Sequence, residues 1–424
     1  MIKSIGIDFG TTNSVVALLH ADGTVTTARH AAGETLVDVF RSILCFWTEE
    51  GPGRQTLRHA AGPEAITAYL DEPFDSRLIM SMKTFLAQKS FTETRIFGRP
   101  FTLERLIGRF LAALLARIEA PPRIVVGRPV RFAGDFADDA LGAARLRGAY
   151  AEAGLPEVTL AFEPEAAGAH FAQSLTAPAT VLIGDFGGGT SDFSILRFAP
   201  GLHGGRHGGR QGGVTPLGHA GIGIAGDVFD FRIIDRAIAP LLGKGDSYTI
   251  MGKRLPVPPE YYSGFARWHL LSLMRTPRTL RSIAEVTRTA EHPQRLRHLV
   301  ALIEDELGYA LYQAVSTAKA ALSTADSTEL RFAHRDFAVE RCITRAEFEG
   351  WIADDLKRLG ATVDQALATA GVPHAAVDQV FLTGGTAFVP AVRRLFADRF
   401  GTAKLSGGGE FVSVAEGLAR MGAA

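Results

Sequence analysis

Two short segments of this 424-residue sequence are near-copies of each other and carry residues that suit phosphate chemistry. They are IGIDFGTTNSVVAL at 5–18 and IGDFGGGTSDFSIL at 183–196. Each reads as an apolar strand, a lone aspartate, a glycine-rich turn, hydroxyl side chains and a second apolar strand. This is the layout of a β-hairpin whose turn amides can hold phosphate oxygens. The repeat therefore predicts two phosphate-binding hairpins.

Each hairpin places one carboxylate beside its turn. Asp8 and Asp185 stand where the apolar run gives way to the glycines. Carboxylates next to phosphates are typical of a hydrated divalent cation, and Mg²⁺ bound through water is the expected ion.

The turn residues fit this interpretation by type. Glycine lets the backbone adopt positive φ and approach a ligand closely, and hydroxyl or amide side chains can donate to phosphate oxygens. The glycines are Gly10, Gly187, Gly188 and Gly189. The expected donors are Thr11, Thr12, Asn13, Thr190 and Ser191. A single copy could equally be an ordinary tight turn, but two copies favour the phosphate function.

A third segment, DQVFLTGGTAFVPAVRRLFADRFG at 378–401, reads as a strand, a Gly-Gly-Thr turn and an amphipathic helix. Gly384 and Gly385 would let a nucleoside lie against the chain, with Thr386 beside them.

The remaining pattern predicts the elements that position these turns. We expect helices at 103–118, 138–153, 164–175, 345–370 and 413–421, and strands at 123–127 and 158–162. Strands that alternate with crossover helices indicate an α/β fold.

Two phosphate hairpins followed by a GGT turn resemble the actin-like ATPase superfamily. Within it, the sequence is similar to the ATPase domain of the DnaK-type, seventy-kilodalton heat-shock chaperones. The narrower resemblance rests also on FEPEAAGA at 162–169, AGDVFDFRI at 225–233 and AKAALS at 318–323. VVGRPVRF at 125–132, SMKTFL at 81–86 and GGGEFVSVAEGLAR at 407–420 are similar to the YegD-like branch.

The resemblance implies an actin-like, duplicated ribonuclease-H-like fold with two lobes around a central nucleotide cleft. The lobes would cover residues 1–177 and 178–424, with a small inserted subdomain in the first and a helical insertion at about 227–325 in the second. The sequence ends soon after the last expected ATPase-domain helix, so no peptide-binding domain is expected.

The resemblance also implies roles for single residues. Glu163 and Asp185 would orient or polarise the water that attacks the γ-phosphate, and Thr190 and Asp192 would lie near that phosphate and the metal. Glu163 could instead be only a favourable charge at a helix N-terminus. The implied nucleotide-binding residues of the later motifs are Gly226, Lys319, Ser323, Gly384, Gly385, Thr386 and Phe388.

Some family positions differ. The lysine of the family's G-D-A-A-K string is replaced by Ile66 in GPEAI, so a phosphate-contacting lysine is expected to be missing. Lys83 could reach the same phosphate, or could be an exposed lysine. The glutamate and arginine around the A-K-x-x-L-S string are Ser316 and Ala320. Phe388 replaces an arginine after the GGT turn and could stack on the base.

Composition excludes some functions. The 45 basic and 45 acidic residues cancel, so no nucleic-acid binding is expected. Cys45 and Cys342 are expected to be free thiols. No leader or membrane-spanning stretch is apparent, which predicts a cytoplasmic protein.

The glycine-rich stretch 199–214 contains His203 and His207 interleaved with Arg206 and Arg210. These histidines could bind a metal, but a flexible connection is the simpler interpretation.

The expected function is that of an ATP- and Mg²⁺-dependent chaperone-like ATPase, acting as a monomeric switch for a protein partner or client. A nucleotide-exchange factor or co-chaperone would assist it. A small-molecule kinase, a binding-only pseudo-ATPase and an actin-like filament protein stay open as alternatives.

Overall fold

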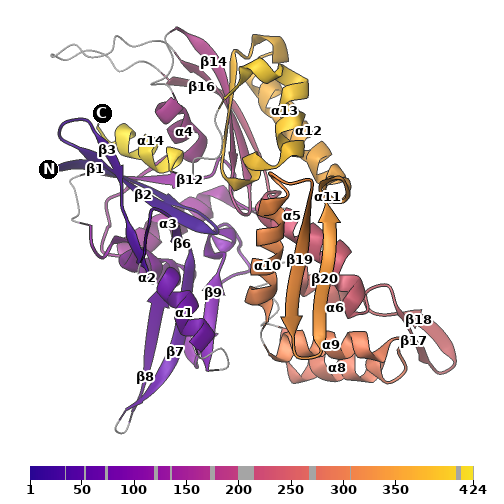
Figure 1. Cartoon of the computed structure of the whole chain (residues 1–424). Coiled ribbons are helices and arrows are strands. Elements are labelled where there is room, and N and C mark those ends of the chain that lie inside the picture. Colours follow the sequence, from indigo (N-terminus) through magenta and orange to yellow (C-terminus); the bar gives the residue numbers. More distant parts are fainter. Residues whose placement is uncertain are drawn as a thin grey trace. The chain divides into compact units, whose positions relative to one another are not determined.

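The structure is a computed structural model that describes residues 1–33, 35–51, 54–71, 75–118, 123–133, 136–171, 177–198, 214–266, 274–305, 307–406 and 412–423. The chain divides into two compact units. Figure 1 colours the chain by residue number, so that each unit can be found from its residues. Unit 1 is Met1–Ala225 with Leu356–Ala424, and unit 2 is Gly226–Asp355. The two-lobe boundary at 177/178 is a different division and stays a prediction.

Unit 1 contains two sheets of the same topology (Figure 1). In each, an antiparallel hairpin is extended by a third antiparallel strand on one side and by two parallel strands on the other. The first sheet has β13 (Thr159–Phe162), β12 (Ile124–Arg128), β1 (Ile2–Phe9), β2 (Asn13–His20) and β3 (Val25–Thr27), with β6 (Phe40–Arg41) beside β2. The second has β16 (Val214–Ile222), β15 (Ser191–Phe198), β14 (Ala179–Phe186), β21 (Gln379–Thr383) and β22 (Leu405–Ser406). The duplication predicted from the two hairpin segments is confirmed.

A small β-rich insertion follows the first sheet's hairpin. Its elements are β4 (His30–Ala32), β5 (Thr35–Val37), β7 (Ile43–Gly51), β8 (Arg54–Ala61), α1 (Pro63–Asp71), β9 (Ser76–Met80), the 3₁₀ helix η1 (Met82–Phe85), β10 (Thr94–Ile96) and β11 (Arg99–Phe101). Strands β8, β7 and β9 form one sheet. The sequence pattern did not resolve the separate strands of this stretch, because its polar and apolar residues do not alternate cleanly.

Two helices support the first sheet. α2 (Leu103–Leu115) begins at Thr102, whose hydroxyl accepts from the Arg105 amide, and α3 (Asp139–Glu152) begins at Asp138, whose carboxylate accepts from the Leu141 amide. Such side-chain caps satisfy amides that have no partner within the helix. The helix predicted at 103–118 is confirmed over Leu103–Leu115, and its side chains Leu106, Phe110 and Leu114 are buried in the core.

The C-terminal helix α14 (Ser413–Met421) packs closely on β1 and on α4 (Glu163–Phe171). A Cβ at Gly6 would come within 2.1 Å of the Ala415 carbonyl oxygen, and one at Gly417 within 1.7 Å of the Ala166 carbonyl oxygen. The Ser4 hydroxyl donates to the Ala419 carbonyl over 2.5 Å. These contacts require glycine on both surfaces.

Unit 2 is mostly helical and contains two hairpins. Its elements are α5 (Gly226–Ile233), η3 (Ile234–Ile238), η4 (Ala239–Leu242), β17 (Ser247–Ile250), β18 (Lys253–Pro256), α6 (Glu260–Ser263), η5 (Gly264–Ala266), α8 (Pro277–Thr287), α9 (Pro293–Glu304), α10 (Gly308–Ala321), β19 (Ser327–His334), β20 (Phe337–Thr344) and α11 (Arg345–Trp351). The predicted helix 345–370 is two helices, α11 and α12 (Ala353–Ala370). They separate at the fully buried Ile352, whose backbone leaves the helical region.

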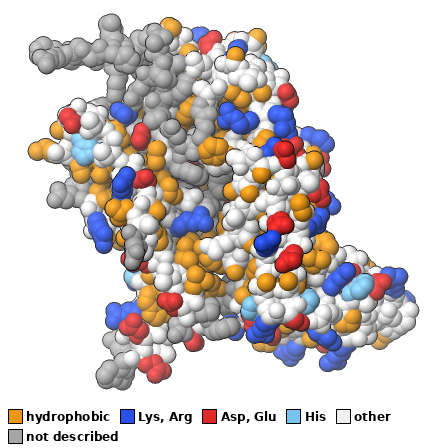
Figure 2. All heavy atoms as spheres, in the orientation of Figure 1, with side chains coloured by type: hydrophobic (Ala, Val, Ile, Leu, Met, Phe, Trp, Pro, Cys, Tyr) orange, Lys and Arg blue, Asp and Glu red, His pale blue; other side chains and the backbone are white. Residues whose placement is uncertain are grey.

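Figure 2 shows basic and histidine side chains on the visible face near β17, β18 and α8 of unit 2. Several are balanced by acids: Arg254 pairs with Glu291 and Arg295 pairs with Asp246. Such pairs indicate an ordinary solvated surface. In the described part of the chain, no helix is both long enough and apolar enough to cross a bilayer.

Candidate active site

A lysine and a glutamate form a buried ion pair in unit 1. Lys83 lies in η1, and Glu163 is the first residue of α4, directly after β13. The Lys83 Nζ donates to Glu163 Oε1 over 2.6 Å, and only 10% and 6% of the two side chains are exposed. The alternative of an exposed Lys83 is therefore wrong. Glu163 is the first residue of a helix, so the alternative that it is a favourable charge at a helix N-terminus is partly met. Its carboxylate, however, accepts a hydrogen bond from Lys83.

Three aspartates interact with the charges of this pair. Asp8 lies near the end of β1, and Asp185 and Asp192 stand opposite each other in the β14–β15 ladder. Burial and then Glu163 raise the pKa of Asp8 to about 7 and that of Asp192 to about 7. Burial, Glu163 and Asp8 also raise the pKa of Asp185. Four carboxylates thus face one ammonium group, and the site favours added positive charge.

Lys83 keeps its charge in this setting. Burial disfavours the ammonium form, but attraction to Glu163, Asp8 and Asp185 outweighs burial and raises the pKa of Lys83. Ile66, by contrast, lies half-buried on α1. The family's lysine position is Ile66, as predicted, and the buried cation beside the carboxylates is Lys83, which the sequence offered as the alternative. A contact between Lys83 and a phosphate stays a prediction.

The two hairpin turns lie next to each other. A Cβ at Gly189 would be 3.5 Å from Thr11 Oγ1 and 3.4 Å from Thr84 Cγ2. A Cβ at Gly10 would come within 2.1 Å of the Asn13 carbonyl oxygen, so the first turn requires glycine. The Asn13 side chain is already engaged, since its oxygen accepts from Arg41 over 3.0 Å. Thr11 is buried, whereas Thr12, Gly188 and Thr190 are partly exposed and Gly187 is exposed.

Arg145 of α3 anchors the segment that carries Lys83. Its guanidinium donates to the carbonyls of Phe85, Leu86, Gln88 and Phe91 over 2.7–3.3 Å. It also pairs with Glu104 of α2 at 3.5 Å. One side chain that bonds four carbonyl oxygens between residues 85 and 91 fixes the end of η1 and the chain after it against the two core helices.

Two further residues border the carboxylates and were not predicted. The Tyr150 side chain is fully buried, its hydroxyl has no hydrogen-bond partner among the described residues, and burial together with Asp8 and Glu163 raises its pKa. The Arg131 amide donates to Asp192 Oδ1 over 3.4 Å. Arg131 belongs to the VVGRPVRF string, which was the available signal, whereas Tyr150 looked like any core aromatic on a helix.

The GGT turn lies beside the second hairpin. Asp185 of β14 pairs in register with Thr383 of β21, directly before the turn. Gly384 has φ +87°, and a Cβ there would come within 2.0 Å of the Phe186 carbonyl oxygen. Thr386 is buried, Gly385 is exposed and 42% of Phe388 is exposed. The backbone of this turn, rather than the Thr386 hydroxyl, faces outward.

In unit 2, two of the predicted nucleotide residues come together. The Lys319 Nζ donates to the Gly226 carbonyl oxygen over 3.1 Å and pairs with Asp230 at 2.8 Å. Ser316, Ala320 and Ser323 lie on or directly after the same helix, α10. Asp230 stands in the AGDVFDFRI string and was not singled out.

The described residues contain no group of three histidine, cysteine or acidic side chains arranged to ligate a metal directly. The aspartates fit the predicted ion only as carboxylates that act through water, and their surplus negative charge is the feature that suits it. The glycine-rich stretch 199–213 with His203 and His207 lies outside the described residues.

The raised aspartate pKa values predict how stability depends on pH. Between its unfolded pKa near 3.8 and about 7, folded Asp8 holds its proton more tightly than the unfolded chain does. Stability therefore falls as pH rises through this window, and charged Asp8 remains costly above it. In EDTA without nucleotide, Asp8→Asn should raise the melting temperature at pH 8 but hardly at pH 4. At pH 8 the free energy of unfolding should rise by about 1–2 kcal/mol. Asp398→Asn, at an exposed site on α13 (Pro390–Phe400), is the control, and an effect of Asp8→Asn that does not vary with pH would contradict the prediction.

Comparison with known proteins agrees with the motifs. The family profile described as Hsp70 protein matches residues 301–423. The chaperone protein DnaK of Thermus thermophilus is 26% identical over 416 residues, covering 95% of this chain and 57% of the relative. DnaK of Deinococcus radiodurans is also 26% identical, covering 95% of this chain and 56% of the relative. An HscA homolog of Bordetella petrii is 26% identical, covering 95% of this chain and 55% of the relative.

The chain thus spans little more than half the length of these curated relatives. Over that span it has the actin-like ATPase fold predicted from its motifs, with the duplicated sheets described above. The YegD-like branch stays a prediction. The hairpin pair, the GGT turn and matches along 95% of the sequence support the predicted similarity of this chain to the ATPase domain of the Hsp70 family.

Proposed function

We propose that this protein binds and hydrolyses ATP and acts as a Mg²⁺-dependent, chaperone-like nucleotide switch for a protein partner. The observation that carries the proposal is the Lys83–Glu163 pair among Asp8, Asp185 and Asp192, beside two glycine turns that approach each other. A buried cation and a surplus of carboxylates next to open turn amides suit a phosphate chain that arrives with its cation.

Each side chain has a proposed task. The amides of the turns at Gly10–Thr12 and Gly187–Thr190 bind phosphate oxygens, with Thr11 as an added donor. Lys83 neutralises charge on the terminal phosphate. Glu163, fixed by Lys83, and Asp185 orient the attacking water. Bound Mg²⁺, held through water by Asp8, Asp185 and Asp192, would supply charge neutralisation to the phosphates.

The nucleoside contacts are proposed from the later motifs. Gly384 and Gly385 offer backbone against which a nucleoside can lie, and the half-exposed Phe388 offers a ring for the base. Thr386 contributes through its backbone. Gly226, Lys319 and Ser323 are proposed as nucleoside contacts from their own motifs in unit 2. Because Asp230 already neutralises Lys319, we expect its contact with the base to depend on packing more than on charge.

The partner is proposed to be a protein, since the relatives carry the name chaperone. Opening and closing around a nucleotide would present different surfaces to a client, an exchange factor or a co-chaperone. A monomer, a cytoplasmic location and no binding of nucleic acid or membrane remain predictions.

Calorimetry with MgATP and phosphate release on the same preparation test the proposal. We expect saturable binding and slow hydrolysis, with Asp185→Asn abolishing hydrolysis and Asp398→Asn leaving it unchanged. Binding without hydrolysis would leave a binding-only switch, and release that requires an added metabolite would favour a kinase. Absence of MgATP binding to the folded wild type would overturn the proposal.

Arg145 gives a second, more distant test. Arg145→Lys removes the planar donor that bonds four carbonyls, so η1 should loosen and Lys83 should lose its fixed place. We expect the rate of hydrolysis to fall by about tenfold, with less change in ATP affinity. Arg147→Lys, at an exposed position on the same helix, is the matched control. Equal rates for the two variants would show that Arg145 does not position the lysine.

A further inference from the structure

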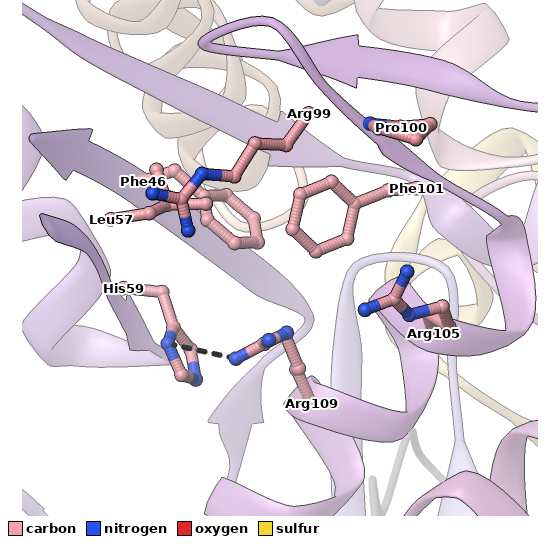
Figure 3. A pocket seen from close by; sticks show the side chains of 8 residues that line it. All are labelled: Phe46, Leu57, His59, Arg99, Pro100, Phe101, Arg105 and Arg109. Carbon is pink, nitrogen blue, oxygen red and sulfur yellow. Dashed lines mark hydrogen bonds between the residues drawn. The ribbon is translucent and has the colours of Figure 1, made fainter. Parts of the chain in front are cut away.

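Unit 1 contains a hollow of about 320 Å³ that shares no residue with the candidate active site. It lies in the small β-rich insertion, between strands β7 and β8, strand β11 and the first turns of α2 (Figure 3). Its volume is at the lower end of the range of small-molecule sites, about 300–1,000 Å³. The proposed ATPase function does not use it.

The floor of the hollow is aromatic. Phe46 and Phe101 are buried, and their ring centroids lie 5.3 Å apart at 56°. Phe101 is the last residue of β11, directly before the Thr102 cap of α2, so the capped helix holds its ring in place. Leu57 of β8 adds an apolar wall. The floor is therefore a fixed surface for a flat apolar group.

Three arginines form the rim. Arg105 and Arg109 stand one turn apart on α2, with guanidinium carbons 5.3 and 5.5 Å from the Phe101 ring centroid. Arg99 comes from β11 and bonds the Gln55 carbonyl oxygen over 3.2 Å. Arg109 also meets His59 Nδ1 at 3.4 Å, as the dashed line in Figure 3 shows. Burial and the nearby Arg109 lower the pKa of His59, so its ring is neutral and can accept this bond.

This rim is not balanced by acid. No aspartate or glutamate lines the hollow, and among the described residues Arg99, Arg105 and Arg109 have no ion pair. Other arginines of the insertion and its helices do have one: Arg58 pairs with Glu49, and Arg95 with Glu93. Three guanidinium groups around one small cavity recognise anions, because their donors match phosphate and carboxylate oxygens.

We propose that this hollow binds a small organic anion, a phosphate or carboxylate group carried on a flat apolar body. The body would lie on Phe46 and Phe101 beside Leu57. The anionic group would meet Arg105, Arg109 and Arg99 at the rim.

Phenyl phosphate is a suitable probe, titrated against the full chain by saturation-transfer NMR. We expect saturable binding that weakens by about tenfold or more in Arg105→Gln/Arg109→Gln, because two charged donors are lost. Arg95→Gln, outside the hollow, and Lys83→Met, in the candidate active site, should leave the affinity unchanged. Melting curves establish that each variant is folded.

A second variant fills the hollow without removing charge. Leu57→Trp should exclude the probe while all three arginines remain. The proposed site would be overturned if Arg105→Gln/Arg109→Gln and Leu57→Trp both bound phenyl phosphate as tightly as wild type. Binding that does not saturate would overturn it as well. Loss of binding in Lys83→Met alone would place the probe at the active site instead, which also overturns it. If inorganic phosphate bound as tightly as phenyl phosphate, the proposed contact of a flat apolar group with Phe46 and Phe101 would be wrong.

Discussion

Replacement of Lys83 by methionine should lower the rate of ATP hydrolysis by about two to three orders of magnitude. Methionine keeps most of the length and apolar volume of the lysine stem but removes the ammonium group. Glu163 would lose its 2.6 Å partner, and the terminal phosphate would lose the buried cation nearest to it. Both losses act mainly on the transition state, so we expect ATP affinity to change less than the rate. Phosphate release and calorimetry on the same preparation measure the two effects.

The control for this variant must separate catalysis from stability, because a buried Glu163 left unpaired destabilises the fold. Lys83→Met/Glu163→Gln removes both charges and should recover the melting temperature without recovering hydrolysis. Lys3→Met, at an exposed position, should behave as wild type in both assays. A Lys83→Met variant with the wild-type rate would show that Lys83 serves the fold alone.

The duplication was predictable because both copies keep the same local order of strand, aspartate, glycine turn and strand. A hairpin turn is specified by a few neighbouring residues, so its sequence signal survives. The structure places Asp8 and Asp185 at corresponding points of two sheets with the same topology. Helix α14 was predicted with its exact bounds for a similar reason, since its apolar residues recur at helical spacing.

The burial and pairing of the lysine were not predictable in the same way. The family's short string leads to Ile66, and the sequence offered Lys83 only as one of two alternatives, whereas the structure buries Lys83 in a 3₁₀ turn. Lys83 and Glu163 are 80 positions apart, and only the packing of η1 under Arg145 brings them together. Local sequence carries no record of such a contact. Tyr150 was missed for the same reason, because its neighbours Asp8 and Glu163 come from other parts of the chain.

Gly417 is a further position whose importance only the structure reveals. It looks like a mild defect in a short helix, where alanine would usually stabilise. A Cβ at Gly417, however, would lie 1.7 Å from the Ala166 carbonyl oxygen and 2.4 Å from its carbon. Both are backbone atoms of α4, which begins at Glu163, so they cannot turn aside as a side chain could. α14 and α4 would have to separate.

Gly417→Ala should therefore lower the free energy of unfolding by about 3 kcal/mol or more, as expected for overpacking against rigid backbone. Gly350→Ala is the matched control, because Gly350 lies on helix α11 with no atom within 4 Å of an added Cβ. That change should stabilise by about 0.5–1 kcal/mol. Urea unfolding of the three proteins measures both effects.

Because a shift of α4 would carry Glu163 away from Lys83, a folded Gly417→Ala protein should also lose hydrolysis. A variant as stable and as active as wild type would show that the two helices can separate there without cost.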